Sequence, residues 1–450
     1  MTKQNSPLLL GTEPISKLLT QYAIPAIIAM TASSLYNIAD SIFIGHGVGP
    51  LAISGLALTF PIMNVAAAFG SLVGAGSATL ISLKLGQKDY GAANQVLGNV
   101  LMLNIILGVS FTVIGLAVLD PILYFFGASD QTIGYAREYM QIILIGNVVT
   151  HMYLGLNSVL RSAGFPRLAM NITLASVIIN CILNPIFIFW MDWGIKGSAW
   201  ATVISQIISL AYQFYHFSKP THLIRFQKGI YGMKRDLVKD ILAIGMSPFL
   251  MNLCSSMVVI LINRGLKEHG GDLAIGAYGI VNRVVFLFVM IIMGLNQGMQ
   301  PIAGYNYGAR LYSRVSEVTK LTMKYGIGVA TVGFLLGELA PSVIARVFTT
   351  DQELIDIAVK GMRVVFAVFP IVGFQMVATN FFLSIGMPKK SIFLSLSRQL
   401  IFLIPFLIIM PRFLGTLGVW ISIPMADLTA AVITFFVLMN QFKKFKEQPQ

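Results

Sequence analysis

The chain has 450 residues, of which 56% are hydrophobic and only 11% are charged. A soluble domain carries about 25% charged residues, so this composition excludes an ordinary soluble protein, and it also excludes a protein with a single membrane anchor. The net charge of +13 could indicate nucleic-acid binding, but the basic residues lie between apolar runs instead of forming one stripe interleaved with aromatic residues. We therefore expect an integral membrane protein that binds no nucleic acid.

Apolar runs of about 20 residues or more recur along the whole chain and predict membrane-spanning helices. Runs of this length favour helices over barrel strands, which cross a membrane in about 10 residues. The predicted helices cover, in chain order, residues 17–44, 53–83, 93–119, 134–161, 168–190, 197–217, 238–263, 274–303, 319–347, 361–385, 392–411 and 419–441. The sequence thus predicts an all-α integral membrane protein with twelve transmembrane helices.

The distribution of Lys and Arg indicates the orientation, because short cytoplasmic loops carry an excess of these residues. Twenty of the 31 basic residues fall on the side of both termini, and seven fall on the opposite side. The first apolar run is too long for a cleavable signal peptide. We expect a multi-pass protein of the cell inner (plasma) membrane with both termini in the cytoplasm.

A weak internal repeat relates the two halves of the chain at an offset of 222 residues. It aligns residues 51–53 with 273–275, and residues 164–167 with 386–389. Six helices in each half give both halves the same orientation, as in transporters built from parallel repeats. The predicted parts are an N-lobe at residues 1–220, a cytoplasmic linker at 221–237 and a C-lobe at 238–450 with a short basic tail.

Four sequence motifs resemble those of the multidrug and toxic compound extrusion (MATE) transporters, in particular the DinF-like and MepA-like branch. They are Tyr36–Gly45, Leu160–Pro166, Asn180–Pro185 and Gln300–Ala309. The resemblance covers essentially the whole chain and implies the MATE fold, with two pseudo-twofold-related lobes of six helices. It also implies an antiporter coupled to H⁺ or Na⁺ that exports amphipathic or cationic drugs and toxic compounds by alternating access.

Asp40 is the leading candidate for chemistry, because a carboxylate inside a membrane span costs several kcal/mol and is functional by default. Asn180 and Asn184 share one helix face, and Ser198 and Thr202 have the same i, i+4 spacing. Taken alone, such polar pairs serve equally well to join helices. The resemblance maps Asp40, Asn180, Asn184 and Thr202 onto the cation site, where Na⁺ or H⁺ would bind. Members of the branch usually have aspartate where this chain has Asn184.

Two further features concern movement and charge. Pro25 lacks a backbone N–H, so the first helix can bend there, and we expect ion binding at Asp40 to bias that bend. Arg398 and Asp427 lie inside the eleventh and twelfth predicted helices. We interpret them as a secondary polar pair that neutralises both charges, with a proton relay in the C-lobe as the alternative.

The substrate is harder to identify, because abundant Met and Phe residues suit adaptable apolar surfaces as well as lipid-facing packing. We expect small drug-like molecules and membrane lipids as partners, no cofactor beyond the coupling ion, and a monomer. The residues that we select as candidates for a substrate cavity are Tyr36, Met63, Asn64, Arg283, Gln297 and Gln300.

Two other functions compete with the antiporter. A flippase for a lipid-linked saccharide, from the same superfamily, would need several basic residues inside the membrane, and only Arg283 and Arg398 are clear candidates. A membrane-embedded enzyme would need a nucleophile beside a base. His151 lies well inside a span but neighbours no second group of this kind in the sequence. The sequence therefore favours a transporter over an enzyme.

Overall fold

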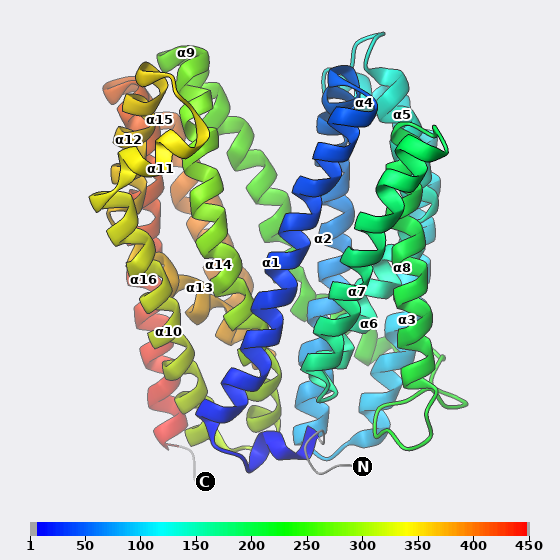
Figure 1. Cartoon of the computed structure of the whole chain (residues 1–450). Helices are drawn as coiled ribbons and strands as arrows, with labels where there is room; N and C mark the ends of the chain where they lie inside the picture. Colours follow the sequence, from blue (N-terminus) through cyan, green and yellow to red (C-terminus); the bar gives the residue numbers. More distant parts are fainter. Residues whose placement is uncertain (1–6, 448–450) are drawn as a thin grey trace. The chain divides into compact units, whose positions relative to one another are not determined.

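The computed structural model describes residues 7–447, apart from the side chains of residues 7, 37, 38 and 50. Within this range the regular elements are all helices, which confirms the predicted all-α class (Figure 1). The elements of the first half are η2 (Pro7–Gly11), α1 (Ile15–Gly47), α2 (Pro50–Gly86), α3 (Tyr90–Ala117), α4 (Leu119–Phe125), α5 (Ile133–Ile145), α6 (Asn147–Ser162), α7 (Pro166–Pro185), the π-helix η3 (Ile186–Trp190) and α8 (Ile195–Phe217). Those of the second half are α9 (Arg235–Gly308), α10 (Tyr312–Leu339), α11 (Pro341–Phe348), α12 (Gln352–Phe366), α13 (Phe369–Ser384), α14 (Pro388–Leu396), the π-helix η4 (Ser397–Leu403), α15 (Ile404–Leu414) and α16 (Thr416–Glu447).

These helices account for the predicted membrane spans. Between residues 7 and 447, seven helical segments are long and apolar enough to cross a membrane, and three bent helix pairs bring the number to ten. One of the seven, α9, is 74 residues long and contains two spans, because the backbone leaves the helical conformation at Gly271, where φ is 69°. The remaining predicted span is α8, with 23 residues. With α9 counted as two spans and with α8, which lies outside that set of ten, residues 7–447 contain the twelve predicted helical spans in the predicted order.

The apolar runs gave no sign of three sharp bends. The pairs α5–α6, α10–α11 and α12–α13 are bent by 54°, 85° and 51°. Two of the bends lie beside Pro341 and Pro370, where the missing N–H interrupts the helix. The third lies at Gly146, where a Cβ atom would come within 2.5 Å of Cγ2 of Val203 on α8. Glycine therefore lets α8 approach the bend closely.

The chain divides into two compact units. Of the described residues, unit 1 comprises 7–9 and 28–249, and unit 2 comprises 10–27 and 250–447. The boundaries fall inside α1 and α9, shortly after Pro25 and Pro248, and they are related by the same 222-residue offset as the sequence repeat. The predicted division placed all of α1 in the N-lobe and the seventh helix in the C-lobe. Packing instead assigns the first part of each helix to the other unit.

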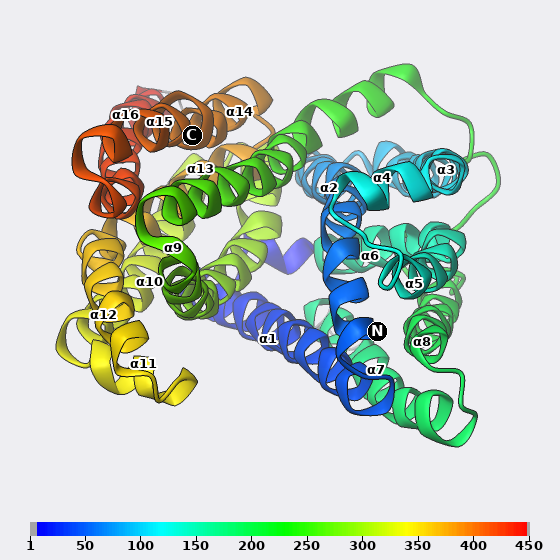
Figure 2. The ribbon, with the colours of Figure 1, turned by 90° about the horizontal axis from the view of Figure 1, so that it is seen from above.

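Small residues explain why the start of α9 packs within unit 1. A Cβ atom at Gly245 of α9 would lie 1.8 Å from the backbone oxygen of Leu72 on α2. A Cβ atom at Gly76 of α2 would lie 2.1 Å from the backbone oxygen of Ile241 on α9. The two backbones are therefore in direct contact, as small residues allow between membrane helices. In the same unit, α6 lies inside the bundle and packs against α2, α3 and α8 (Figure 2).

The linker between α8 and α9 is tied to α3. The side-chain amide of Gln95 donates hydrogen bonds to the carbonyl oxygens of Ile230 and Gly232, at 2.7 and 2.6 Å. Asn94 donates to the carbonyl oxygen of Leu223 at 3.0 Å and accepts from the backbone N–H of Arg225 at 2.9 Å. The linker thus follows the surface of unit 1 in a defined conformation.

In unit 2, the segment before residue 28 packs against the second half of α9. A Cβ atom at Gly298 would lie 2.6 Å from the backbone of Ala23. Arg314, near the start of α10, donates to the carbonyl oxygens of Leu10 and Glu13, at 3.1 and 2.6 Å. The start of α1 is therefore held by both backbone contact and hydrogen bonds.

Candidate functional site

A network of buried polar side chains joins α1, α7 and α8 in unit 1. Asp40 of α1 is only 5% exposed, although it lies in an apolar helix. Its Oδ1 atom accepts a hydrogen bond from Nδ2 of Asn184 at 2.9 Å and another from the hydroxyl of Ser198. The carboxylate of α1 is thus held by one side chain from α7 and one from α8.

The network continues from Asn184 to the neighbouring turns. Nδ2 of Asn184 also donates to Oδ1 of Asn180 at 2.8 Å, and Nδ2 of Asn180 donates to the hydroxyl of Thr202 at 3.2 Å. The hydroxyl of Tyr36 lies 2.8 Å from the same Thr202 oxygen. The structure therefore brings together all four residues that the resemblance assigned to the cation site.

Local backbone features place α7 and α8 side by side. Pro185 ends α7 directly after Asn184, and the wide turns of η3 follow. Gly194 turns the chain with φ at 55°, a value that favours glycine. A Cβ atom at Gly197 would lie 2.9 Å from the backbone of Phe187, so α8 begins in close contact with η3. This hairpin brings the first turn of α8 beside the end of α7.

The oxygen atoms of the network suit a small monovalent cation. Asp40 supplies one negative charge, and the side chains around it are neutral amides and hydroxyls. Oδ1 of Asn184 is completely buried and has no hydrogen-bond partner among the described residues. An unpaired buried carbonyl oxygen is costly, and it can coordinate Na⁺. Asp40, Asn180, Asn184 and Thr202 therefore fit Na⁺ by their chemistry, and the carboxylate also fits a proton.

Two partners in this network were not assigned from the sequence. Ser198 bonds directly to Asp40, although only its spacing to Thr202 had marked it. Tyr36, predicted as a cavity residue, bonds to Thr202. The helical spacing indicated which face carries these residues, but it could not indicate their neighbours.

The other candidate cavity and helix-bending residues lie on α1, α2 and α9. Met63 packs against the hydrophobic core of unit 1 and accepts a hydrogen bond from Thr59 at its sulfur, at 3.6 Å. Asn64 is exposed on α2. Three candidates lie on α9 in unit 2: Arg283 is exposed, Gln297 is half-buried and Gln300 is buried. Pro25 lies inside α1, as the sequence requires.

Arg398 and Asp427 form an ion pair in unit 2. Nε of Arg398 donates to Oδ1 of Asp427 at 2.5 Å, and the Asp427 side chain is only 3% exposed. Because Arg398 neutralises it, this carboxylate differs from that of Asp40, whose partners are uncharged. Of the two, only Asp40 bears an uncompensated charge within its described contacts.

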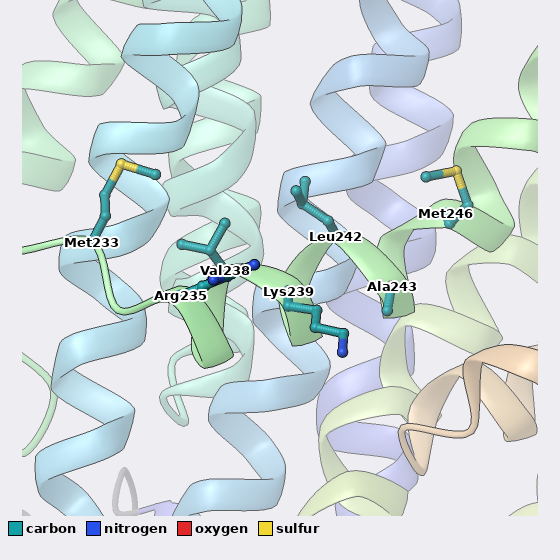
Figure 3. A pocket seen from close by; sticks show the side chains of 7 residues that line it. All are labelled: Met233, Arg235, Val238, Lys239, Leu242, Ala243 and Met246. Atoms are coloured by element: carbon teal, nitrogen blue, oxygen red, sulfur yellow. The ribbon is translucent and has the colours of Figure 1, made fainter.

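A cavity of about 680 Å³ opens beside the first turns of α9 (Figure 3). Its lining is mostly apolar, with two basic side chains. The residues are Met233, Arg235, Val238, Lys239, Leu242, Ala243 and Met246. None of the predicted substrate-cavity residues is among them.

Comparison with known sequences agrees with the resemblance seen in the motifs. The MatE family model matches residues 25–186 and 244–409. The multidrug export protein MepA of Staphylococcus haemolyticus (strain JCSC1435) is 28% identical over 426 residues, which cover 95% of this chain and 94% of that protein. The protein of the same name from Staphylococcus aureus (strain N315) is 28% identical over 429 residues, which cover 94% of each chain.

Solved structures share the fold over almost the full length of the chain. One described as the outward-facing conformation of a multidrug resistance MATE family transporter of the MOP superfamily has a TM-score of 0.93 and 25% identity, and covers 99% of this chain and 100% of that one. A crystal structure of MATE in the bent conformation also has a TM-score of 0.93 and 25% identity, with 99% of each chain covered. These matches confirm the predicted MATE fold, and the chain belongs to the MatE family of multi-pass membrane transporters.

Proposed function

We propose that this transporter is a cation-coupled antiporter that exports amphipathic or cationic drugs and toxic compounds. The names of the relatives in two Staphylococcus species, both multidrug export proteins, support this substrate class. The predicted orientation supports the plasma membrane as the location, with both termini in the cytoplasm and efflux directed outward.

The observation that carries the proposal is the environment of Asp40. Its carboxylate is 5% exposed in an apolar helix, and its two described partners are the neutral side chains of Asn184 and Ser198. An isolated charge in this position costs several kcal/mol, and a bound cation would remove most of that cost. The site therefore favours a state in which one monovalent cation is bound.

We assign the coupling preferentially to H⁺, with Na⁺ as the alternative. Only one carboxylate is present, because Asn184 stands where the related branch usually has an aspartate. A single carboxylate is neutralised fully by one proton, whereas Na⁺ must also replace its hydration shell with oxygen ligands. Three neutral residues could supply these ligands: Asn180, Asn184 and Thr202.

Movement of α1 would link cation binding to transport. Asp40 belongs to unit 1, whereas the part of α1 before Ile28 belongs to unit 2. Pro25 lies close to this boundary and weakens the helix there. Cation binding can shift the conformation only if the two states differ in affinity for the cation. A bend near Pro25 would change the position of Asp40 relative to α7 and α8, and so would change that affinity.

The test is efflux of a fluorescent cationic drug from proteoliposomes, with pH and Na⁺ gradients imposed separately. We expect the proton gradient to drive efflux by the wild type, and we expect Asp40→Asn to abolish the gradient-driven part. Asp130→Asn is the matched control, because it makes the same change at an exposed position. Efflux driven by neither gradient would refute the antiporter, and wild-type coupling in Asp40→Asn would place the site elsewhere.

A further inference from the structure

A continuous polar stripe runs along the buried face of α8. Its members recur every three or four residues, which places them on one side of the helix. Each is less than 9% exposed. The six residues are Ser198, Thr202, Ser205, Ser209, Gln213 and His216.

This stripe faces the neighbouring helices α6 and α7. Near one end, Thr202 accepts a hydrogen bond from Asn180 of α7. Further along, the side-chain amide of Gln213 donates to the carbonyl oxygen of Tyr153 on α6 at 3.2 Å. The side chain of Tyr153 in turn interacts with Thr173 of α7. The stripe therefore lies inside unit 1, away from the lipid-facing side of α8.

Three polar atoms in the second half of the stripe have no hydrogen-bond partner among residues 7–447. They are Oγ of Ser209, Oε1 of Gln213 and Nε2 of His216, and all three are buried. An unsatisfied buried polar group costs about 1–3 kcal/mol, so three such groups on one face call for partners. Side chains three or four residues apart on a helix have Cβ atoms about 5–6 Å apart. One water molecule with two hydrogen bonds can span such a gap.

The two ends of the stripe connect the Asp40 network with the linker. From Ser198 to His216 the helix rises about 27 Å, close to the roughly 30 Å thickness of the hydrocarbon core. Ser198 donates its hydroxyl hydrogen bond to Asp40. At the other end, the ring of His216 lies 4.1 Å from that of His222, between the ring centroids. His222 is in the linker, outside the membrane-spanning helices.

We propose that the α8 stripe is a hydrated passage through which the coupling cation exchanges between the Asp40 network and the aqueous phase on the linker side. The inference rests on the proposed cation coupling, and it adds the route that the ion takes. Hydroxyl, amide and imidazole groups of the stripe hold a file of water molecules across the bundle. The passage serves H⁺ or Na⁺. It ends at His216, next to Lys219 and His222 at the start of the linker.

Hydration of the stripe can be tested without measuring transport. In a variant with Cys181→Ala and Cys254→Ala, we would introduce Ser209→Cys and expose proteoliposomes to Ag⁺. Thiols that bind Ag⁺ would then resist labelling by a maleimide after denaturation. The matched control is Ile207→Cys, at the same depth but on the opposite side of α8, where Ile207 is 45% exposed. We expect at least tenfold faster protection of Ser209→Cys, and equal rates in the two variants would overturn the proposal.

Transport gives a second test that does not depend on the introduced thiol. We expect Gln213→Leu to slow gradient-driven efflux at least tenfold while the drug affinity at equilibrium stays within twofold of the wild type. Gln206→Leu makes the same change two turns earlier on α8, at a side chain already paired with Thr150 at 2.5 Å. It should retain efflux within twofold, and equal efflux in the two variants would refute the passage. If the wild type showed no gradient-driven efflux, the proposed coupling would fail, and the Ag⁺ result would still decide whether the stripe is hydrated.

Discussion

Replacing Asn184 by aspartate should make transport strongly dependent on Na⁺. Nδ2 of Asn184 lies 2.9 Å from Oδ1 of Asp40. In Asn184→Asp a second carboxylate oxygen takes the place of this nitrogen, and two like charges at that distance repel by about 6 kcal/mol at an effective dielectric constant of about 20. A cation bound between the carboxylates relieves the repulsion. If about 1.4 kcal/mol of this repulsion remains after the side chains relax, and bound Na⁺ removes it, the affinity for Na⁺ rises about tenfold.

The assay is drug efflux from proteoliposomes across a Na⁺ titration at fixed pH. We expect the Na⁺ concentration for half-maximal efflux to fall at least tenfold in Asn184→Asp. The matched control is Asn157→Asp, which adds the same charge within unit 1 but beside Arg161, whose Nη1 lies 2.6 Å from Oδ1 of Asn157. An unchanged Na⁺ response in Asn184→Asp would show that this side chain does not face the ion. An equal gain in Asn157→Asp would show that added charge acts regardless of position.

Three further changes have defined outcomes. Asp427→Asn should lower stability, because Arg398 loses its counter-charge, but gradient coupling should persist. Complete loss of coupling in a folded variant would move the cation site to unit 2. Gly245→Ala should lower the melting temperature in detergent by several degrees, because its Cβ would lie 1.8 Å from the backbone oxygen of Leu72. Gly279→Ala, which has open space around it, should not, and equal melting temperatures of the two variants would refute the tight contact. Burial and the nearby charge of Lys219 lower the pKa of His222 from its ordinary value of 6.5, so the unfolded chain binds a proton there more readily than the folded protein. Stability should therefore fall as the pH drops below 6.5. His222→Gln should weaken that fall, as measured by the melting temperature across a pH series.

The fold could be predicted from the sequence because span length and loop charge act locally. Apolar runs long enough to cross a membrane identify each helix without knowledge of its neighbours. The bend at Gly146 could not be read in this way, because it depends on the approach of Val203 from a distant helix. The grouping of the first part of α1 and of α9 with the other unit leaves no such sign either. It depends on contacts such as Gly245 with Leu72, which leave no local pattern.

The candidate site was predictable to a smaller extent. Asp40 and Asn184 stand out as polar groups in apolar helices, and the resemblance supplied their grouping. The direct bond from Ser198 to Asp40 depends on the tight hairpin through Gly194, whose geometry no sequence spacing reveals. The role of Met63 in a substrate cavity stays a prediction, and the structure adds that its half-buried side chain packs against the hydrophobic core.

The division of α1 and α9 between the units has a consequence for the synthesis of the protein. Unit 1 cannot be complete until the ribosome has made residue 249, because its last helical segment is the start of α9. Residues 10–27 emerge first, yet their partners, such as Gly298 and Arg314, are made much later. At about 5–20 residues per second, the stretch between residues 27 and 298 takes about 14–54 s to translate. The newborn segment must remain inserted and unpaired for that time, and it is then an exposed target for membrane proteases and insertion factors.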